Sequence, residues 1–106
     1  MDITKKHRVP CEGGVPVLSA KEIKNLLKQT PKWKIKKKHL WRAFKFKEFL
    51  PAMRFVNKVA TLAEMEGHHP DFHIHYNIVE LDIWTHAING LSENDFILAA
   101  KINKLK

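Results

Sequence analysis

The chain has 106 residues, 44% of them hydrophobic, and its 19 basic and 11 acidic side chains give a formal net charge of +8. A chain of this length forms one hydrophobic core and hardly two, so we expect a single domain whose modest stability a second copy could supplement. Its single cysteine excludes an internal disulfide, and no apolar run approaches the ~18 residues of a spanning helix, so we expect a cytoplasmic protein without membrane contact.

The N-terminal segment, residues 1–17, is predicted to be a surface arm. It carries two prolines and two glycines between residues 10 and 16, and these residue types suit neither a helix nor a strand. Residues 18–106 are predicted to be the folded domain. They contain no internal repeat and no low-complexity segment.

A short helix and a β-hairpin are predicted next along the chain. Ser19 and Glu22 have the spacing of a capping box, in which each side chain bonds to the backbone of the other residue, and Pro31 ends the helix. From residue 33 to residue 46 the apolar side chains recur with a period of two, and three consecutive lysines at 36–38 predict a turn. This pattern indicates two antiparallel strands.

The longest predicted helix spans residues 47–66, with Pro51 tolerated in its first turn and Gly67 at its end. One apolar row is predicted to face the core and consists of Phe49, Ala52, Met53, Val56, Ala60 and Ala63. A second apolar row lies off that face and consists of Phe55, Val59 and Leu62. Because two rows make the helix too hydrophobic for the surface of a monomer, we expect the second row to be buried between subunits.

A second hairpin is predicted over residues 72–85, with a turn near Asn77. After Gly90, Ser92 is placed to cap a last helix, and Asp95 lies in the positively polarised first turn. The predicted core residues of that helix are Phe96, Ala99, Ile102 or Ala100, and Leu105. The order α-β-β-α-β-β-α predicts an α+β single domain, in which a four-stranded antiparallel sheet has its helices packed on one face.

Five of the seven histidines fall between His68 and His86, where a helix end, a loop and a strand end can converge. Imidazole titrates near neutral pH and can give or take a proton, so several held together favour acid–base catalysis. Glu64, on the last turn of the preceding helix, is close in sequence to the two loop histidines. His68 and His69 are neighbours in a loop stiffened by Pro70 and are expected to point apart, which indicates different roles for them.

The residues around this cluster resemble the signature of the pterin-4a-carbinolamine dehydratases. That signature combines an acidic or polar residue, a His-His-Pro run shortly after it, an aromatic residue, a later histidine and an aspartate. The matching residues are Glu64, His68, His69, Pro70, Tyr76, His86 and Asp95. The resemblance also includes Thr85, the run at residues 90–92, the arm at 9–14 and the strands at Trp33 and at 42–46, and so covers most of the chain.

The resemblance implies an enzyme that eliminates the 4a-hydroxyl group of a tetrahydropterin carbinolamine and yields a quinonoid dihydropterin, without a metal or an organic cofactor. It makes His68, His69 and His86 the expected catalytic residues. We expect His69 and His86 to transfer protons and His68 to orient the substrate, and the sequence leaves open which histidine is the acid. The expected supporting residues are Glu64, Pro70, Tyr76 and Asp95.

The resemblance also implies self-association, because members of this family form dimers through sheet edges and tetramers through helices. A homodimer or homotetramer is therefore expected, and a pterin is the expected small-molecule partner. Some members also bind transcription factors through the same helical surface. A protein-binding module or transcriptional cofactor is thus the alternative function.

Two other classes of site are weaker interpretations. A zinc site built from three of the cluster histidines and Glu64 is chemically possible, but their spacing matches no closed structural site. Residues 32–47 hold eight basic and no acidic side chains, yet no base-reading motif accompanies them, so nucleic-acid binding is not expected.

Several ring-bearing residues have ordinary structural interpretations. His73 and His75 flank Ile74 outside the signature and are expected on a solvated strand face. Large aromatic side chains in strands pack in cores or interfaces more often than they stack on a flat ligand. We therefore expect core or interface positions for Trp33, Trp41 and Trp84.

Overall fold

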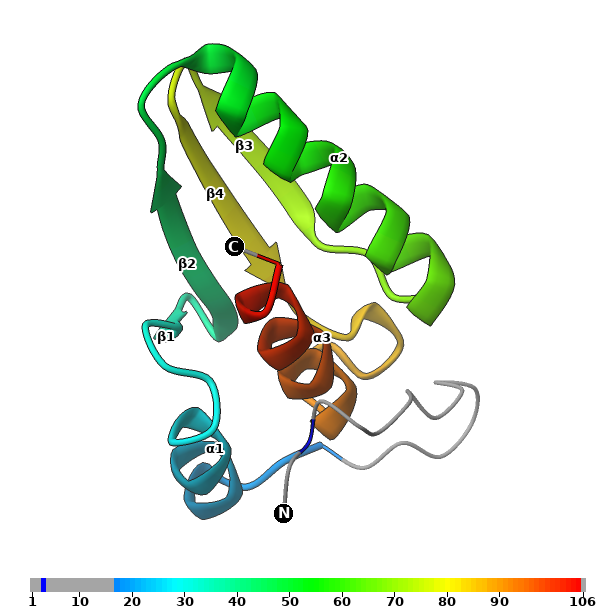
Figure 1. Ribbon diagram of the computed structural model, residues 1–106. Coiled ribbons are helices and arrows are strands. Elements are labelled where there is room, and N and C mark those ends of the chain that lie inside the picture. The colour runs from blue at the N-terminus through cyan, green and yellow to red at the C-terminus, as the bar shows by residue number, and fades with distance from the viewer. Residues whose placement is uncertain (1–2, 4–16, 106) are drawn as a thin grey trace.

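Within residue 3 and residues 17–105, which the computed structural model describes, three α-helices and four strands follow one another in the predicted order α-β-β-α-β-β-α (Figure 1). They are α1 (Ala20–Leu27), β1 (Lys34–Lys36), β2 (His39–Lys45), α2 (Phe49–Glu66), β3 (Asp71–His75), β4 (Ile78–Ile83) and α3 (Glu93–Asn103), with a 3-10 turn, η2 (His86–Ile88), before α3. The predicted α+β class is confirmed. The rest of the predicted arm, including Cys11, and residue 106 lie outside the described residues.

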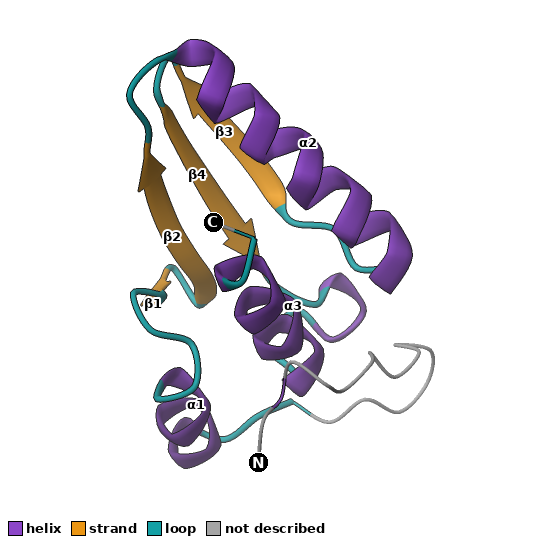
Figure 2. Cartoon of the chain, in the orientation of Figure 1, coloured by secondary structure: helices purple, strands orange, loops and turns teal. Residues whose placement is uncertain are grey.

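The sheet is antiparallel with the strand order β1-β2-β4-β3, and α2 and α3 cover one of its faces (Figure 2). Side chains of β2 and β4 that point toward these helices are buried, namely Leu40, Phe44, Val79, Leu81 and Ile83. The opposite face, called the outer face below, carries exposed or half-buried side chains, namely Trp41, Ala43, Lys45, Asp71, His73, His75, Glu80 and Asp82. This alternation is what a sheet with one covered face requires.

Both predicted hairpin turns are confirmed. Lys37 and Lys38, between β1 and β2, have φ values of 52° and 65°, and Tyr76, between β3 and β4, has a φ of 53°. Non-glycine residues in this left-handed region cost about 1–2 kcal/mol each, so the strand pairing on either side must hold them there. The turn after β3 is also tied to the end of β2, because Asn77 Nδ2 donates to the carbonyl oxygen of Phe46 at 2.9 Å.

The capping box predicted for the first helix is present at the start of α1. The backbone N–H of Ser19 donates to Glu22 Oε1 at 2.9 Å, and the backbone N–H of Glu22 donates to Ser19 Oγ at 3.2 Å. The backbone hydrogen bond from Ser19, followed by its side-chain hydrogen bond, lowers the pKa of the Glu22 carboxyl below its ordinary value. The helix therefore begins where the sequence places it.

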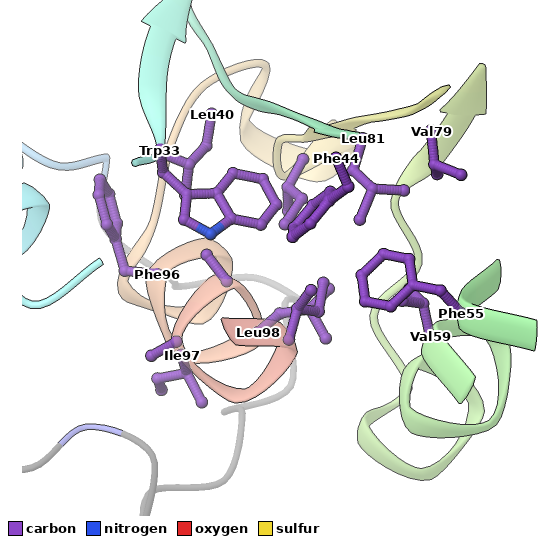
Figure 3. Close-up of a cluster of buried hydrophobic side chains, with 14 of the residues drawn as sticks. Trp33, Leu40, Phe44, Phe55, Val59, Val79, Leu81, Phe96, Ile97 and Leu98 are labelled. Carbon is purple, nitrogen blue, oxygen red and sulfur yellow. The ribbon is translucent and has the colours of Figure 1, made fainter. Parts of the chain in front are cut away.

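The prediction for the faces of α2 is wrong in one respect. The row expected off the core contains Phe55 and Val59, and both are buried against the sheet, whereas Phe49 and Ala60 of the expected core row are exposed. Phe55 packs on Phe44 of β2, with 4.6 Å between ring centroids (Figure 3). Helical periodicity allows either of two neighbouring apolar rows to face the core. The row with Phe55 does so, because the contact of its ring with the aromatic side chains of the sheet stabilises the fold more. None of the described helices is long and apolar enough to cross a membrane.

The last helix is buried more completely than an amphipathic pattern predicts. In α3 the residues from Asn94 to Ala100 and Ile102 are all buried, because the helix lies between the sheet and α1. Ile3 is also a member of the hydrophobic core, with 2% of its surface exposed. This residue of the predicted surface arm is therefore not at the surface. Burial of a large aliphatic side chain stabilises the fold by about 1.5–3 kcal/mol, which favours this position.

An ion pair between Glu66 and Lys101 joins the end of α2 to α3, with 2.9 Å between Oε2 and Nζ and both side chains largely buried. Replacing Glu66 with alanine is expected to lower the free energy of unfolding by about 2 kcal/mol, because the Lys101 ammonium would lose a hydrogen-bonded partner in a site with little water. Denaturant unfolding measures the loss. Met65→Ala, at the highly exposed neighbouring position, is the control and should change stability by less than about 0.5 kcal/mol. Equal effects of the two replacements would contradict the prediction.

Candidate active site

The end of α2 delivers two histidines to one edge of the domain. Gly67 ends the helix in the left-handed conformation, with a φ of 64°, which glycine adopts without steric cost. The backbone N–H of His68 then donates to the carbonyl oxygen of Ala63 at 3.2 Å and fixes the direction in which the chain leaves the helix. The His-His-Pro run therefore has a defined position before β3 begins.

His68 is anchored in a buried hydrogen-bond network. Its Nε2 atom donates to Asp95 Oδ1 at 2.6 Å, and Asp95 itself has no exposed surface. The other oxygen of that carboxylate accepts from Thr85 Oγ1 at 3.0 Å and from the backbone N–H of Ser92 at 2.8 Å. One aspartate thus fixes a histidine, the segment after β4 and the start of α3, and both of its carboxylate oxygens have partners.

His69 is held in a different way, as the sequence predicts for adjacent loop residues. Its Nε2 atom donates to Glu64 Oε2 at 2.5 Å, and both side chains are largely exposed. A carboxylate on Nε2 fixes the tautomer of a neutral imidazole, so the lone pair lies on Nδ1. His69 can therefore take a proton on one nitrogen while Glu64 holds the other.

His86 enters the same region from the opposite side of the site. It begins η2, and Trp84 and Thr85 lie between it and the end of β4. An isolated bridge between Thr85 and Gly90 closes the loop that carries it, with the N–H of Thr85 donating to the carbonyl oxygen of Gly90 at 2.9 Å. Its exposed ring stacks on Trp84, with 4.1 Å between centroids and 14° between planes. Segments from α2 and from the β4–α3 connection thus meet at the site.

An open pocket of about 310 Å³ lies between these segments. Its walls are formed by Gly67, His68, His69, Trp84, Thr85, His86 and Ala87. This volume is at the lower end of the range for small-molecule sites. The pocket presents three imidazoles, of which His68 is tied to a buried carboxylate and the other two are exposed.

The structure brings together six of the seven residues singled out in the sequence. The three histidines line the pocket, Glu64 and Asp95 contact them, and Pro70 is buried in the same loop. Tyr76 is not among them within this chain. It lies at the β3–β4 turn, at the far end of the hairpin from the pocket, with 64% of its surface exposed.

Sequence reasoning missed two roles at this site. Trp84 was expected in the core or an interface, yet it is a half-buried wall of the pocket. The sequence places Thr85 only within the family resemblance and Ser92 only there and as a helix cap, whereas both supply partners of Asp95, with 2.7 Å between their hydroxyl oxygens. A threonine directly before a candidate histidine and a serine three residues before an aspartate were the available signals.

Two further histidines of the predicted cluster lie outside the pocket. His73 and His75 are exposed on the outer face, near Asp82 at 3.5 Å and Glu80 at 3.2 Å, as predicted for a solvated strand. Among the residues that the structure describes, no three His, Cys, Asp or Glu side chains are arranged to hold a metal ion. The zinc interpretation therefore gains no support from the geometry of this part of the chain.

The fold and the pocket together define a small single-domain α+β protein with a pocket lined by three histidines. The sequence model of the family described as Pterin 4 alpha carbinolamine dehydratase matches residues 16–105. The chain belongs to this family.

Individual relatives agree with the family model. A provisionally named pterin-4-alpha-carbinolamine dehydratase from Rickettsia canadensis (strain McKiel) is 49% identical over 102 residues, which are 94% of each chain. One from Methylococcus capsulatus is 46% identical over 105 residues, covering 97% of this chain and 92% of the relative. The crystal structure of a transcriptional coactivator/pterin dehydratase from Brucella melitensis has a TM-score of 0.81 and 33% identity, covering 85% of this chain and 98% of that one.

Proposed function

We propose that this protein is a dehydratase that eliminates water from 4a-hydroxytetrahydrobiopterin or a closely related 4a-hydroxytetrahydropterin and gives the quinonoid dihydropterin. The observation that carries the proposal is the pocket in which His69 and His86 are both accessible while His68 is anchored on buried Asp95. Family membership supplies the substrate class. The cytoplasm is the expected compartment, because a lone cysteine suits a reducing environment.

The reaction needs two proton transfers. The bond between C4a and the hydroxyl oxygen breaks, the departing hydroxide takes a proton and leaves as water, and the adjacent ring nitrogen loses a proton as the new double bond forms. We assign these transfers to His69 and His86, because both rings are exposed at the pocket and neither is tied to a buried group. Either histidine can serve as the acid, since coupled neighbours share protons.

The other residues have supporting roles in this proposal. His68 orients the bicyclic ring, and its hydrogen bond to Asp95 keeps the imidazole from rotating. Glu64 holds the His69 ring in place through the hydrogen bond between His69 Nε2 and Glu64 Oε2. Pro70 stiffens the loop that presents both histidines.

The proposal is tested by following the dehydration of a 4a-hydroxytetrahydropterin spectroscopically, with purified protein in a chelator and with the spontaneous rate subtracted. Acceleration of about 10²-fold or more is expected, which is the contribution typical of positioned acid–base groups. A folded protein that leaves the spontaneous rate unchanged would refute it.

We also propose that the protein forms a homodimer or homotetramer, with α2 at one interface. Phe49 and Leu50 at the start of α2 expose 45% and 63% of their surface, and Ile74 on edge strand β3 exposes 39%. Large exposed apolar side chains that lie together mark an interaction surface. The corrected orientation of α2 matters here, because Phe55 is in the core and cannot serve as a contact.

Leu50→Glu is expected to lower the molar mass in solution by one association step, because a charge would enter a dry contact. Light scattering after size-exclusion chromatography measures the change. Asn57→Glu, at an exposed polar position of the same helix, is the matched control and should keep the native mass. Identical masses for the native chain and both variants would exclude this part of α2 from the interface.

Protein binding through the same surface is the second candidate function, favoured by the exposed Phe49 and Leu50 and by the dual name of the solved relative. A binding module of this kind would respond to Leu50→Glu and would be indifferent to His69→Ala. A dehydratase responds to His69→Ala.

A further inference from the structure

Three flat rings stack in a column that reaches from the pocket to the outer face of the sheet. His39, the first residue of β2, lies parallel to Trp84, with 3.9 Å between ring centroids and 3° between planes. Trp84 in turn lies nearly parallel to His86, at 4.1 Å and 14°. Two imidazoles centred this close to one indole cannot share a face without overlapping, so they cover its opposite faces.

This arrangement determines what Trp84 can do. Both faces of the indole are occupied, so it does not offer a stacking surface to a pterin in this conformation. It can instead act as a spacer between two imidazoles. Among the described residues, the ring contact with Trp84 is the interaction that holds the exposed His86 imidazole.

The position of His39 is itself set by the sheet. The pairing of Leu40 with Ile83 places the residues next to them, His39 and Trp84, side by side on the outer face. His39 Nδ1 lies 3.8 Å from Asp82 Oδ1, a contact that favours the observed ring orientation. The same carboxylate also lies 3.5 Å from exposed His73 on the neighbouring strand.

We propose that His39 is a positioning residue of the active site, acting through Trp84 to set the place and tilt of His86. This inference rests on the proposed dehydratase function for its effect on rate, and on geometry alone for its effect on the His86 ring. His39 lies outside the residues that resemble the family signature. Misplacing a proton-transfer group by a fraction of an ångström is enough to slow catalysis.

The test compares His39→Ala, His39→Phe and His75→Ala in the full-length protein. Phenylalanine keeps a flat ring on Trp84 and loses the imidazole nitrogens. His75 is the matched control, because it is a histidine on the same face that lies 3.2 Å from a carboxylate and has no ring contact with Trp84. Thermal unfolding of all three variants establishes that each is folded.

Two readouts are needed. In nuclear magnetic resonance spectra the ring protons of His86 should lie upfield because of the indole ring current, and His39→Ala should move them toward free imidazole while His39→Phe and His75→Ala leave them in place. In the dehydration assay His39→Ala should lower kcat about five-fold with little change in KM, since it disturbs the geometry of a reacting group. His39→Phe should restore most of that loss.

The possible results distinguish a failure of the inference about His39 from a failure of the proposed dehydratase function. If His39→Ala behaves as His75→Ala does in both readouts, His39 does not position His86 and the inference is overturned. If kcat falls equally in His39→Ala and His39→Phe, the ring stack is not the cause and the inference is also overturned. If the native protein shows no dehydration, the proposed function fails while the His86 resonances still decide whether His39 positions the ring.

Discussion

Replacing Asp95 with alanine is expected to lower the free energy of unfolding by about 3–5 kcal/mol, which is a large part of the stability of a domain of this size. The carboxylate has no exposed surface and accepts hydrogen bonds from His68, Thr85 and the backbone of Ser92. Alanine would leave all three donors without their partner in a site closed to water, and each unsatisfied group costs about 1–3 kcal/mol. Urea unfolding followed by circular dichroism measures the loss.

Glu48→Ala is the control for this replacement. Glu48 also carries a carboxylate at the start of a helix, but it is exposed and makes no side-chain capping bond, so its loss should cost less than about 0.5 kcal/mol. Asp95→Asn should fall between the two, since one oxygen still accepts while the amide group faces a donor. A cost below about 1 kcal/mol for Asp95→Ala would mean that the network does not organise the site as described.

Replacing His69 with alanine is expected to reduce kcat for dehydration about 100-fold while the stability of the fold changes little. The side chain is 59% exposed, so little packing is lost, and its chemistry is that of one positioned proton-transfer group. Stopped-flow absorbance at saturating substrate measures kcat. The Glu64 carboxylate would remain and could not replace the imidazole, because it is an acceptor on the far side of the lost ring.

His73→Ala is the matched control for the His69 variant. His73 is 55% exposed and lies 3.5 Å from the Asp82 carboxylate, so it resembles His69 in exposure and in pairing but is on the outer face. Its kcat should equal that of the native protein. An equal loss in both variants would indicate a general effect of removing surface histidines instead of a specific site.

The order of the helices and strands was predictable, because the sequence signals that begin and end each element are local. Each signal affects only the backbone within a few residues of it. Examples are the Ser19–Glu22 capping box, the lysine turn before residue 39 and the helix-ending glycine at 67. The orientation of α2 was not predictable, because its two apolar rows are equivalent until the sheet is in place. Phe55 then faces Phe44, which is 11 positions earlier in sequence but on a different element.

The sequence predicts which residues form the candidate site but not how their side chains are arranged. Spacing and family resemblance select the three histidines, Glu64, Pro70 and Asp95, which the fold gathers at one edge. Tyr76 shares that resemblance yet lies at the opposite end of the hairpin. The contact of Trp84 with His39 depends on strand register across 45 positions, which no pattern within one strand contains.

The most direct test of the central claim compares two double replacements in the dehydration assay. The variant that combines His69→Ala with His86→Ala lacks both accessible imidazoles of the pocket, and it is predicted to dehydrate the 4a-hydroxytetrahydropterin no faster than the spontaneous reaction. The variant that combines His73→Ala with His75→Ala lacks two exposed imidazoles of the outer face and should keep the native rate. A folded pocket double variant that still accelerates the reaction would contradict the assignment of proton transfer to His69 and His86.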